Sequence, residues 1–396
     1  MFETLQMAPP DAILGLTEAF KNDSNPDKIN LGVGVYKDAQ GATPTLKAVQ
    51  AAERQLVEAN SGKSYLAIDG LPSYRQHIPA LLWGETHPRV AENRAVSVQT
   101  PGGTGGLRVA ADFLRQKAGV ARMWCSKPTW ANHPNIFKAA GLQVETYNYL
   151  DDSGRALDFA AMMDSLQNIP AGDAICLHAC CHNPSGVDPS LEQWKEIAQT
   201  LRERKILPLV DFAYQGFGDG MDEDAAGLRT LSEAGGDLLV CTSYSKNFGL
   251  YSERIGGLTV SGDSAETVGV AHSQVKACVR ANYSNPPRHG AAIVAAILSD
   301  AELRGQWEQE LAEMRQRIQQ MRSLFVETMK QHAPEHDFSF IARQRGMFSF
   351  SGLTRMQVDQ LKSQHSIYIV GSGRINVAGM TEANMPRLCQ AIAGVL

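Results

Sequence analysis

Residues 191–211 read LEQWKEIAQTLRERKILPLVD, in which an amphipathic helical stretch runs directly into a short apolar segment. The same alternation fills the middle of the chain, and its apolar runs predict buried strands at residues 95–99, 121–126, 173–180, 206–211 and 237–243. Strands that alternate with helices are joined by right-handed crossovers and form a mainly parallel sheet. We therefore predict an α/β fold, with a large domain whose mainly parallel sheet is flanked by helices.

A different pattern begins near residue 300. Between Glu302 and Lys330 the apolar residues follow one another at steps of three and four, which predicts one long amphipathic helix. A coiled coil shows similar spacing, but a single helix that links two domains is the simpler interpretation. The segments 338–342, 346–353 and 367–379 then read as strands of a smaller α+β domain.

These patterns suggest the domain boundaries. We expect a large domain at residues 46–310 and a small C-terminal domain at residues 311–396. Residues 1–45 contain no long crossover unit, so we expect them to form an N-terminal arm and part of the small domain. A chain of 396 residues is long enough for two such domains.

Composition narrows the class of protein. The hydrophobic fraction is 43%, the charged fraction 20%, the net charge −5 and the pI about 6.1, so there is no electrostatic reason to expect nucleic acid or an anionic membrane as a partner. No apolar run is long enough to span a bilayer. The stretch MFETLQMAPPDAILGL lacks the basic residues of a secretory or transit signal, and seven cysteines in a chain of this length suggest free thiols. We expect a cytoplasmic protein.

Polar residues with chemical potential follow three predicted strands. Asn183 follows DAICLHACCH, Asp211 closes ILPLVD with Tyr214 three residues later, and Lys246 follows DLLVCTSYS. Ligands of open parallel sheets bind at the carboxyl ends of the strands. One edge of the sheet would therefore present an amide, a carboxylate, a phenol and an amine together.

This combination has a chemical logic. The amine of Lys246 can form a Schiff base with an aldehyde cofactor. The carboxylate of Asp211 can keep a pyridine nitrogen protonated, and the phenol and amide can hold the charge of a ring oxygen. Each residue alone has an ordinary explanation, a surface lysine or a helix-capping aspartate. Their coincidence at successive strand ends favours catalysis.

A phosphate group would need its own site. TPGGTGG, residues 100–106, lies between a predicted strand and a predicted helix, where small residues and free backbone N–H groups can receive an anion. The segment is not a Walker loop and is a poor dinucleotide fingerprint. Ser243, Ser245 and Arg254 form a second candidate anion site, although the two serines could simply cap a turn.

The segment CLHACCHN, residues 176–183, contains two histidines and three cysteines and so resembles a metal site. However, Cys180 and Cys181 are adjacent, alternate faces on a strand and lack the C-x-x-C spacing of zinc ligands. Packing of a strand is the preferred interpretation, and we expect no metal.

SYSKNFGLYSERIGG, residues 243–257, resembles the cofactor-lysine segment of the class I, fold-type I pyridoxal-phosphate aminotransferases, in particular the bacterial aspartate and aromatic aminotransferases. Six further segments match the same family in the same order: INLGVGVYKD, TPGGTGG, CCHNPSG, DFAYQGFG, RANYSNPP and SGRINVAGM. The resemblance runs from about residue 2 to the C-terminus. It implies ping-pong transamination between L-aspartate and 2-oxoglutarate, giving oxaloacetate and L-glutamate.

The resemblance also implies residue roles. Lys246 would bind pyridoxal phosphate covalently and move a proton, Asp211 would pair with the pyridine nitrogen, and Tyr214 and Asn183 would contact the ring hydroxyl. Trp130 would stack on the ring, with His133 supporting Asp211. The phosphate ligands would be Gly103, Thr104, Ser243, Ser245 and Arg254.

Other implied roles concern substrate and a second subunit. Arg374 would bind the substrate α-carboxylate, and Gly34, Trp130 and Asn183 would line the substrate pocket. In a homodimer, Tyr65 would reach the neighbouring phosphate and Arg280 the neighbouring substrate's side-chain carboxylate. Arginine suits both carboxylates because its planar fork binds two oxygens at once.

Alternatives remain at this point. Cofactor residues alone permit another reaction on the same cofactor, but a second arginine at position 280 favours dicarboxylic substrates; an interface salt bridge is the other explanation of Arg280. Aromatic amino acids could be the main substrates, and a non-catalytic sensor could retain the fold. By resemblance, cis bonds are also expected before the prolines that follow Lys127 and Asn183.

Overall fold

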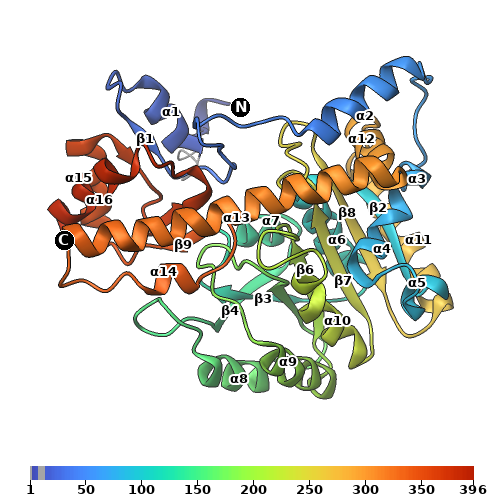
Figure 1. Ribbon diagram of the computed structural model, residues 1–396. Helices are drawn as coiled ribbons and strands as arrows, with labels where there is room; N and C mark the ends of the chain where they lie inside the picture. Colours follow the sequence, from blue (N-terminus) through green and yellow to red (C-terminus); the bar gives the residue numbers. More distant parts are fainter. Residues whose placement is uncertain (1, 8–13) are drawn as a thin grey trace.

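The computed structural model describes residues 2–7 and 14–396. Its centre is a seven-stranded sheet with the order β2-β8-β7-β6-β5-β3-β4 (Figure 1). The strands are β2 (Ala95–Pro101), β3 (Arg122–Lys127), β4 (Gln143–Asn148), β5 (Ala174–His178), β6 (Leu207–Phe212), β7 (Leu238–Ser243) and β8 (Ile255–Ser261). Neighbouring strands are parallel except where β8 pairs with β2 and β7. The predicted fold class, with a mainly parallel sheet, is confirmed.

The sequence pattern does not predict β4 or β8, for two different reasons. β4 is an edge strand whose side chains are mostly exposed, so it lacks an apolar run. β8 is buried throughout, but Gly256 and Gly257 interrupt its apolar character. A Cβ at Gly256 would lie 2.6 Å from the carbonyl oxygen of Thr242, so the close approach of β7 and β8 requires glycine there.

Helices cover both faces of the sheet. Consecutive strand residues point to opposite faces: Leu209 and Leu239 belong to one core, and Val210 and Val240 belong to the other. The first core is closed by α6 (Gly102–Gln116), α7 (His133–Ala139) and α11 (Ala265–Asn282). The second core is closed by α4 (His77–Trp83), α8 (Phe159–Asn168), α9 (Leu191–Arg204), α10 (Ala226–Glu233) and α12 (His289–Ser299). The shorter elements around them are α2 (Lys47–Glu58), α3 (Pro72–Arg75), α5 (Pro88–Ala91) and η2 (Glu223–Ala225).

The predicted long helix is confirmed as α13 (Ala301–His332). Asp300 caps its N-terminus by accepting hydrogen bonds from the backbone N–H groups of Glu302 and Leu303. The apolar stripe is buried along most of its length, at Trp307, Leu311, Met314, Ile318, Met321 and Phe325. Figure 1 shows this helix running from the main sheet to the C-terminal elements, so one element carries side chains into both parts of the molecule.

Two small sheets lie beside the C-terminal half of α13. β9 (Phe348–Phe350) pairs antiparallel with β11 (Arg374–Asn376), and β1 (Ile29–Asn30) pairs in parallel with β10 (Ile367–Tyr368). The N-terminal and C-terminal parts of the chain therefore share a sheet. The elements around these strands are η1 (Phe2–Thr4), α1 (Leu14–Asn22), α15 (Arg355–His365), η3 (Val377–Gly379) and α16 (Met385–Val395).

The strand expected at residues 338–342 is wrong. The segment instead contains the short helix α14 (Phe340–Arg343). Phe340 and Ile341 are adjacent in sequence and both buried, which a turn of helix allows and an alternating strand does not. Phe338 stacks on Phe340, with 6.2 Å between the ring centroids.

Candidate active site

A cavity of about 930 Å³ opens at the carboxyl ends of the central strands. Its size lies in the range usual for small-molecule sites. The residues that line it include nearly all those expected from the sequence: Gly34, Gly103, Thr104, Trp130, Asn183, Asp211, Tyr214, Ser243, Ser245, Lys246, Arg254 and Arg374. Segments from residue 34 to residue 374 thus meet at one place, as the strand-end rule predicts.

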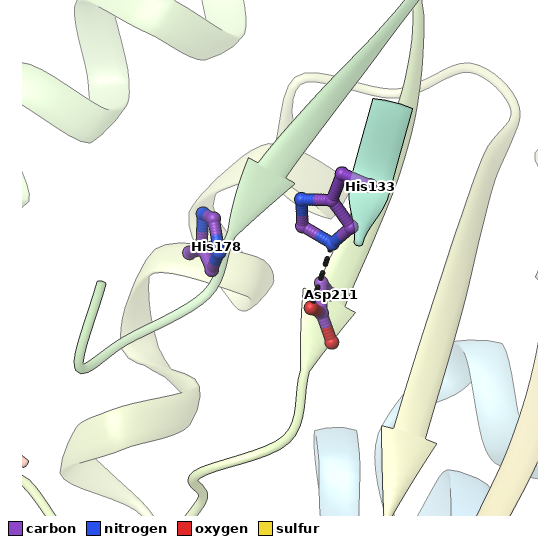
Figure 2. Close-up of side chains that lie close together, drawn as sticks. All are labelled: His133, His178 and Asp211. Atoms are coloured by element: carbon purple, nitrogen blue, oxygen red, sulfur yellow. Dashed lines mark hydrogen bonds and ion pairs between the residues drawn. The ribbon is translucent and has the colours of Figure 1, made fainter. Parts of the chain in front are cut away.

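Asp211 is the carboxylate at the base of this cavity. His133 donates from Nε2 to Asp211 Oδ2 at 3.1 Å (Figure 2). His133 Nδ1 lies 2.7 Å from Thr129 Oγ1. Because a carboxylate can only accept, the proton of His133 is assigned to Nε2. Burial is the largest single effect and opposes the charged form of Asp211. The hydrogen bond from His133 and the charges nearby, including that of Lys246, together outweigh burial and hold the pKa of Asp211 below its ordinary value of 3.8. Asp211 is therefore an anion at neutral pH.

His178 lies beside this pair and is the third residue drawn in Figure 2, with no dashed line to either neighbour. Its ring centroid is 5.2 Å from that of His133, and neither of its buried ring nitrogens has a hydrogen-bond partner among the residues described. Burial and the nearby His133 lower the pKa of His178 to about 3. His178 is therefore neutral and adds no charge beside Asp211.

The histidines and cysteines of the segment 176–183 give two clusters with metal-like geometry. One combines His133, His178 and Asp211, and the other combines Cys180, Cys181 and Asp224. In the second cluster the carboxylate of Asp224 already accepts hydrogen bonds from the backbone N–H groups of Gly216, Gly218 and Asp219. In the first, Asp211 accepts from His133. These hydrogen bonds favour a structural interpretation of both clusters.

Lys246 follows β7 and is the only lysine in the described part of the chain that lines the cavity. Its Nζ atom lies 4.6 Å from the centroid of the Tyr214 ring. Burial lowers the pKa of Lys246 to about 8, with the charge of Arg254 acting in the same direction and that of Asp211 against it. A substantial fraction of this amine is therefore neutral near pH 8, as a nucleophile or general base requires.

The turn that carries Lys246 is held from two sides. Trp307 of α13 donates from Nε1 to the backbone oxygen of Asn247 at 2.7 Å, and its ring stacks on Phe248 with 4.3 Å between centroids. Asn247 Nδ2 donates to the backbone oxygen of Gln215 at 3.3 Å. These contacts fix the peptide next to the reactive amine.

Arg374 lies on β11 and lines the same cavity as Lys246. It is buried, forms no ion pair with any carboxylate of the described chain, and its Nε atom has no hydrogen-bond partner there. Nη1 donates to Asn183 Oδ1 at 3.3 Å and Nη2 to the backbone oxygen of Gly32 at 2.6 Å. Burial lowers the pKa of Arg374 to about 10, so it stays charged at neutral pH. A buried cation without a counterion is suited to binding an anionic ligand.

Tyr214 and Asn183 are linked at the cavity wall. Asn183 Nδ2 donates to the Tyr214 hydroxyl at 3.4 Å. Burial raises the pKa of Tyr214, so the phenol remains protonated and can donate to a ligand oxygen.

Two cis peptide bonds are expected from the sequence, before Pro128 and before Pro184. The bond between Lys127 and Pro128 is cis, as expected, whereas the bond between Asn183 and Pro184 is trans, so the second expectation is wrong.

The candidate phosphate ligands lie together at the N-terminus of α6. Gly103 and Thr104 are in the first turn of this helix, whose N–H groups are free to bind an anion. Ser243 Oγ lies 3.3 Å from Ser245 Oγ, which accepts a hydrogen bond from Arg254 Nη1 at 3.4 Å. Among the described residues, Asp211 is the only acidic one that lines the cavity. The residues therefore fit the groups of pyridoxal phosphate: an anion cradle, a carboxylate for a pyridine nitrogen and a lysine for an aldehyde.

Two expected site residues lie outside the cavity. Tyr65 is 92% exposed, and Arg280 is exposed near the end of α11, where it bonds to Ser284. Neither lines the cavity of its own chain. Both positions are compatible with service to a neighbouring subunit.

Other lining residues are not predicted from the sequence. They are Leu107, Ala131, Asn132, Asn135, Ala213, Tyr251 and Phe348. The hydroxyl of Tyr251 accepts a hydrogen bond from the backbone N–H of Tyr36 at 2.9 Å. Phe348 places its ring 4.2 Å from the Arg374 guanidinium carbon. The sequence predicts only that Phe348 lies in an apolar strand, within GMFSFSGL. Nothing in that segment indicates that its ring lines a ligand site.

A fold of this type with a buried lysine, an aspartate and an anion cradle at the strand ends defines a pyridoxal-phosphate enzyme. The chain belongs to the class I and II aminotransferase family, whose model matches residues 26–392. It is 54% identical to the aspartate aminotransferase of Escherichia coli K12 and 43% identical to that organism's aromatic-amino-acid aminotransferase, with all of each chain covered. It also matches the structure of the aromatic-amino-acid aminotransferase of Burkholderia pseudomallei covalently bound to pyridoxal phosphate, with a TM-score of 0.97, 46% identity and coverage of 100% and 99% of the two chains.

The chain is therefore an aminotransferase with pyridoxal phosphate as its cofactor. None of the described helices is both long and apolar enough to cross a membrane.

Proposed function

We propose that this enzyme transfers the amino group of L-aspartate to 2-oxoglutarate by a ping-pong mechanism, giving oxaloacetate and L-glutamate. The observation that carries the proposal is the buried, unpaired Arg374 in the same cavity as Lys246. A second arginine, Arg280, would bind the side-chain carboxylate from a neighbouring subunit. The relative with 54% identity is an aspartate aminotransferase, which supports the same substrate class.

The residues of the cavity divide the work. Bound pyridoxal phosphate supplies an aldehyde that condenses with amines and a protonated ring that withdraws electrons from the attached carbon. Asp211 keeps the proton on the ring nitrogen, and Tyr214 and Asn183 donate hydrogen bonds to the ring oxygen. Lys246 Nζ would take the proton from the substrate α-carbon and return it to the cofactor carbon on the other side of the transferred nitrogen.

Binding and orientation fall to other side chains. Arg374 fixes the substrate α-carboxylate, which presents the α-carbon to Lys246, and Trp130 covers one face of the ring. Gly34 lines the pocket beside them. The phosphate is held by Gly103, Thr104, Ser243, Ser245 and Arg254, together with Tyr65 of a second subunit.

The absorption spectrum of the purified, cofactor-loaded enzyme tests this function. We expect aspartate to bleach the visible band of the bound cofactor and 2-oxoglutarate to restore it, because each half-reaction moves the amino group on or off the cofactor. Phenylalanine should bleach the band more slowly at equal concentration. A band that responds to neither aspartate nor 2-oxoglutarate would contradict the proposal.

Aromatic amino acids are the second candidate substrates. Trp130, Leu107 and Phe348 give the cavity an apolar wall, and relatives at 43% and 46% identity are aromatic-amino-acid aminotransferases. Faster bleaching by phenylalanine than by aspartate would make this the main activity.

We further propose that the enzyme is a cytoplasmic homodimer with shared active sites. The exposure of Tyr65, Phe2, Leu5 and Met7 supports a partner surface, and all seven cysteines are free thiols, as in a reducing compartment. The proposed domains are residues 46–310 for cofactor binding, and residues 1–45 with 311–396 for the small domain. Residues 1 and 8–13 of the proposed N-terminal arm lie outside the described residues.

Mixed dimers test the sharing of sites. The variants Lys246→Ala and Arg280→Ala should each have little activity with aspartate. When they are unfolded together and refolded at equal amounts, we expect about a quarter of wild-type activity, because half of the dimers are mixed and each has one intact site. Each variant refolded alone is the control. No recovery in the mixture would mean that Arg280 does not serve the neighbouring site.

A further inference from the structure

Arg322 is a buried cation that has no role in binding the cofactor or the substrate. It lies on α13, is 2% exposed and forms no ion pair within the described chain. Burial lowers its pKa to about 10, so it remains charged at neutral pH. A buried charge is costly, and an apolar side chain of similar size is often the more stable choice at such a position. The charge therefore suggests a specific positioning task.

The Arg322 guanidinium forms hydrogen bonds with one short segment of the chain. Nη1 donates to the backbone oxygen of Ile341 at 2.9 Å and to Ser349 Oγ at 2.5 Å. Nη2 donates to the backbone oxygens of Gly346 and Phe348 at 2.7 and 2.8 Å. A planar fork can bind several oxygens in fixed directions, which neither an ammonium nor an apolar group can do.

The same segment is clamped from its other side by the loop that carries Asn183. Arg345 donates its backbone N–H to the oxygen of Gly186 at 2.7 Å. A Cβ at Gly186 would lie 2.6 Å from the backbone oxygen of Phe348, and a Cβ at Gly346 would lie 2.8 Å from Cys181 Sγ. The two segments therefore touch through backbone, so a shift of Phe348 has little room to be absorbed.

Phe348 transmits this constraint to the ligand-binding arginine. Its ring lines the cavity, lies 4.2 Å from the Arg374 guanidinium carbon and meets the Tyr214 ring edge to face at 5.9 Å. A Cβ at Gly34 would lie 2.7 Å from the ring, so Phe348 also closes the gap beside Gly34. The Phe348 ring is therefore one of the surfaces against which the Arg374 guanidinium packs.

We propose that Arg322 is a positioning residue that fixes the Phe348 ring beneath Arg374 and thereby sets the affinity of the site for substrate carboxylates. The inference rests on the proposed role of Arg374. Arg322 does not line the cavity itself and acts through its hydrogen bonds to the segment from Ile341 to Ser349.

The test compares Arg322→Met with Arg315→Met in the cofactor-loaded enzyme. Arg315 is on the same helix but donates to the backbone oxygen of Gly216, outside the Phe348 segment. Binding of succinate, a dicarboxylate that cannot react, is measured by calorimetry alongside KM and kcat for aspartate. For Arg322→Met we expect Kd for succinate and KM to rise roughly 10- to 100-fold, with a much smaller change in kcat. For Arg315→Met we expect changes within about twofold.

A double-mutant cycle separates positioning from general loosening of the fold. Phe348→Leu should weaken succinate binding, and its effect should not add to that of Arg322→Met, because both act on one ring. Additive effects, or equal effects of Arg322→Met and Arg315→Met, would overturn the proposal. If Arg322→Met does not fold, Arg322→Lys, which keeps the charge and loses the fork, must weaken succinate binding in the same direction.

Failure of the proposed function would give a different result. If Arg374→Ala leaves succinate binding unchanged, the assigned role of Arg374 is wrong. If wild-type enzyme binds succinate through Arg374 but does not transaminate aspartate, only the substrate assignment fails, and the comparison of Arg322 variants remains valid.

Discussion

Replacement of Lys246 by alanine is expected to lower the rate of transamination at least about 10⁴-fold, the upper end of what a single general base contributes. Lys246 is the only lysine lining the cavity, and burial lowers its pKa to about 8. No other described residue there supplies an amine to take its place. Steady-state rates and single-turnover bleaching of the cofactor band with aspartate provide the measurement.

Lys195→Ala is a suitable control, since Lys195 is exposed on α9 and does not line the cavity. It should leave the rate unchanged. The Lys246 variant should still bind the cofactor through the anion cradle, but a mild reductant should no longer fix the cofactor to the protein. A Lys246 variant that keeps even a tenth of wild-type activity would show that another group moves the proton.

Replacement of Asp211 by asparagine is expected to lower kcat roughly 10²- to 10³-fold, as for the loss of one preorganised electrostatic group. Asparagine keeps the shape and can still accept the hydrogen bond from His133, so the change isolates the charge. Without that charge the proton on the ring nitrogen of the cofactor is less stable, and the ring withdraws electrons less strongly. The measurement is kcat for aspartate at saturating substrate.

The pH dependence gives a second reading of the same residue. The pKa of Asp211 lies below 3.8 in the folded chain. Its carboxylate therefore stays charged as the pH falls through neutrality and becomes protonated only in acid. Changes in wild-type activity between pH 6 and 9 should therefore come from other groups, such as Lys246. The kcat of wild type should exceed that of Asp211→Asn throughout this range, and the pH profile of the variant should lie at lower pH because it lacks the charge that raises the pKa of Lys246. Equal kcat values of wild type and variant near pH 6 would contradict the assignment.

The central part of the site could be predicted because topology alone brings strand ends together. Asn183, Asp211 and Lys246 each follow an apolar run, and their meeting at one edge follows from a parallel sheet. Residues from distant segments, such as Arg374 and Gly34, could be placed only by family resemblance. Their approach depends on the pairing of β9 with β11, which has no local signal in the sequence.

The failures have specific physical causes. Residues 338–342 are apolar enough for a strand, but the adjacent residues Phe340 and Ile341 are both buried, which a helical turn allows. β8 is hidden by the two glycines that its close packing needs. The task of Arg322 could not be predicted at all, because its partners are mostly backbone oxygens, which every residue carries.

The pairing of β1 with β10 has a consequence for synthesis of the protein. Ile29 pairs with Ile367, so one half of this two-stranded sheet leaves the ribosome long before the other exists. At ordinary rates of translation the interval is on the order of 20 to 70 s. The strands of the main sheet, which end at Ser261, are all made within that interval. The nascent chain can thus form its main sheet first. During that time the segment around Ile29 has no partner strand.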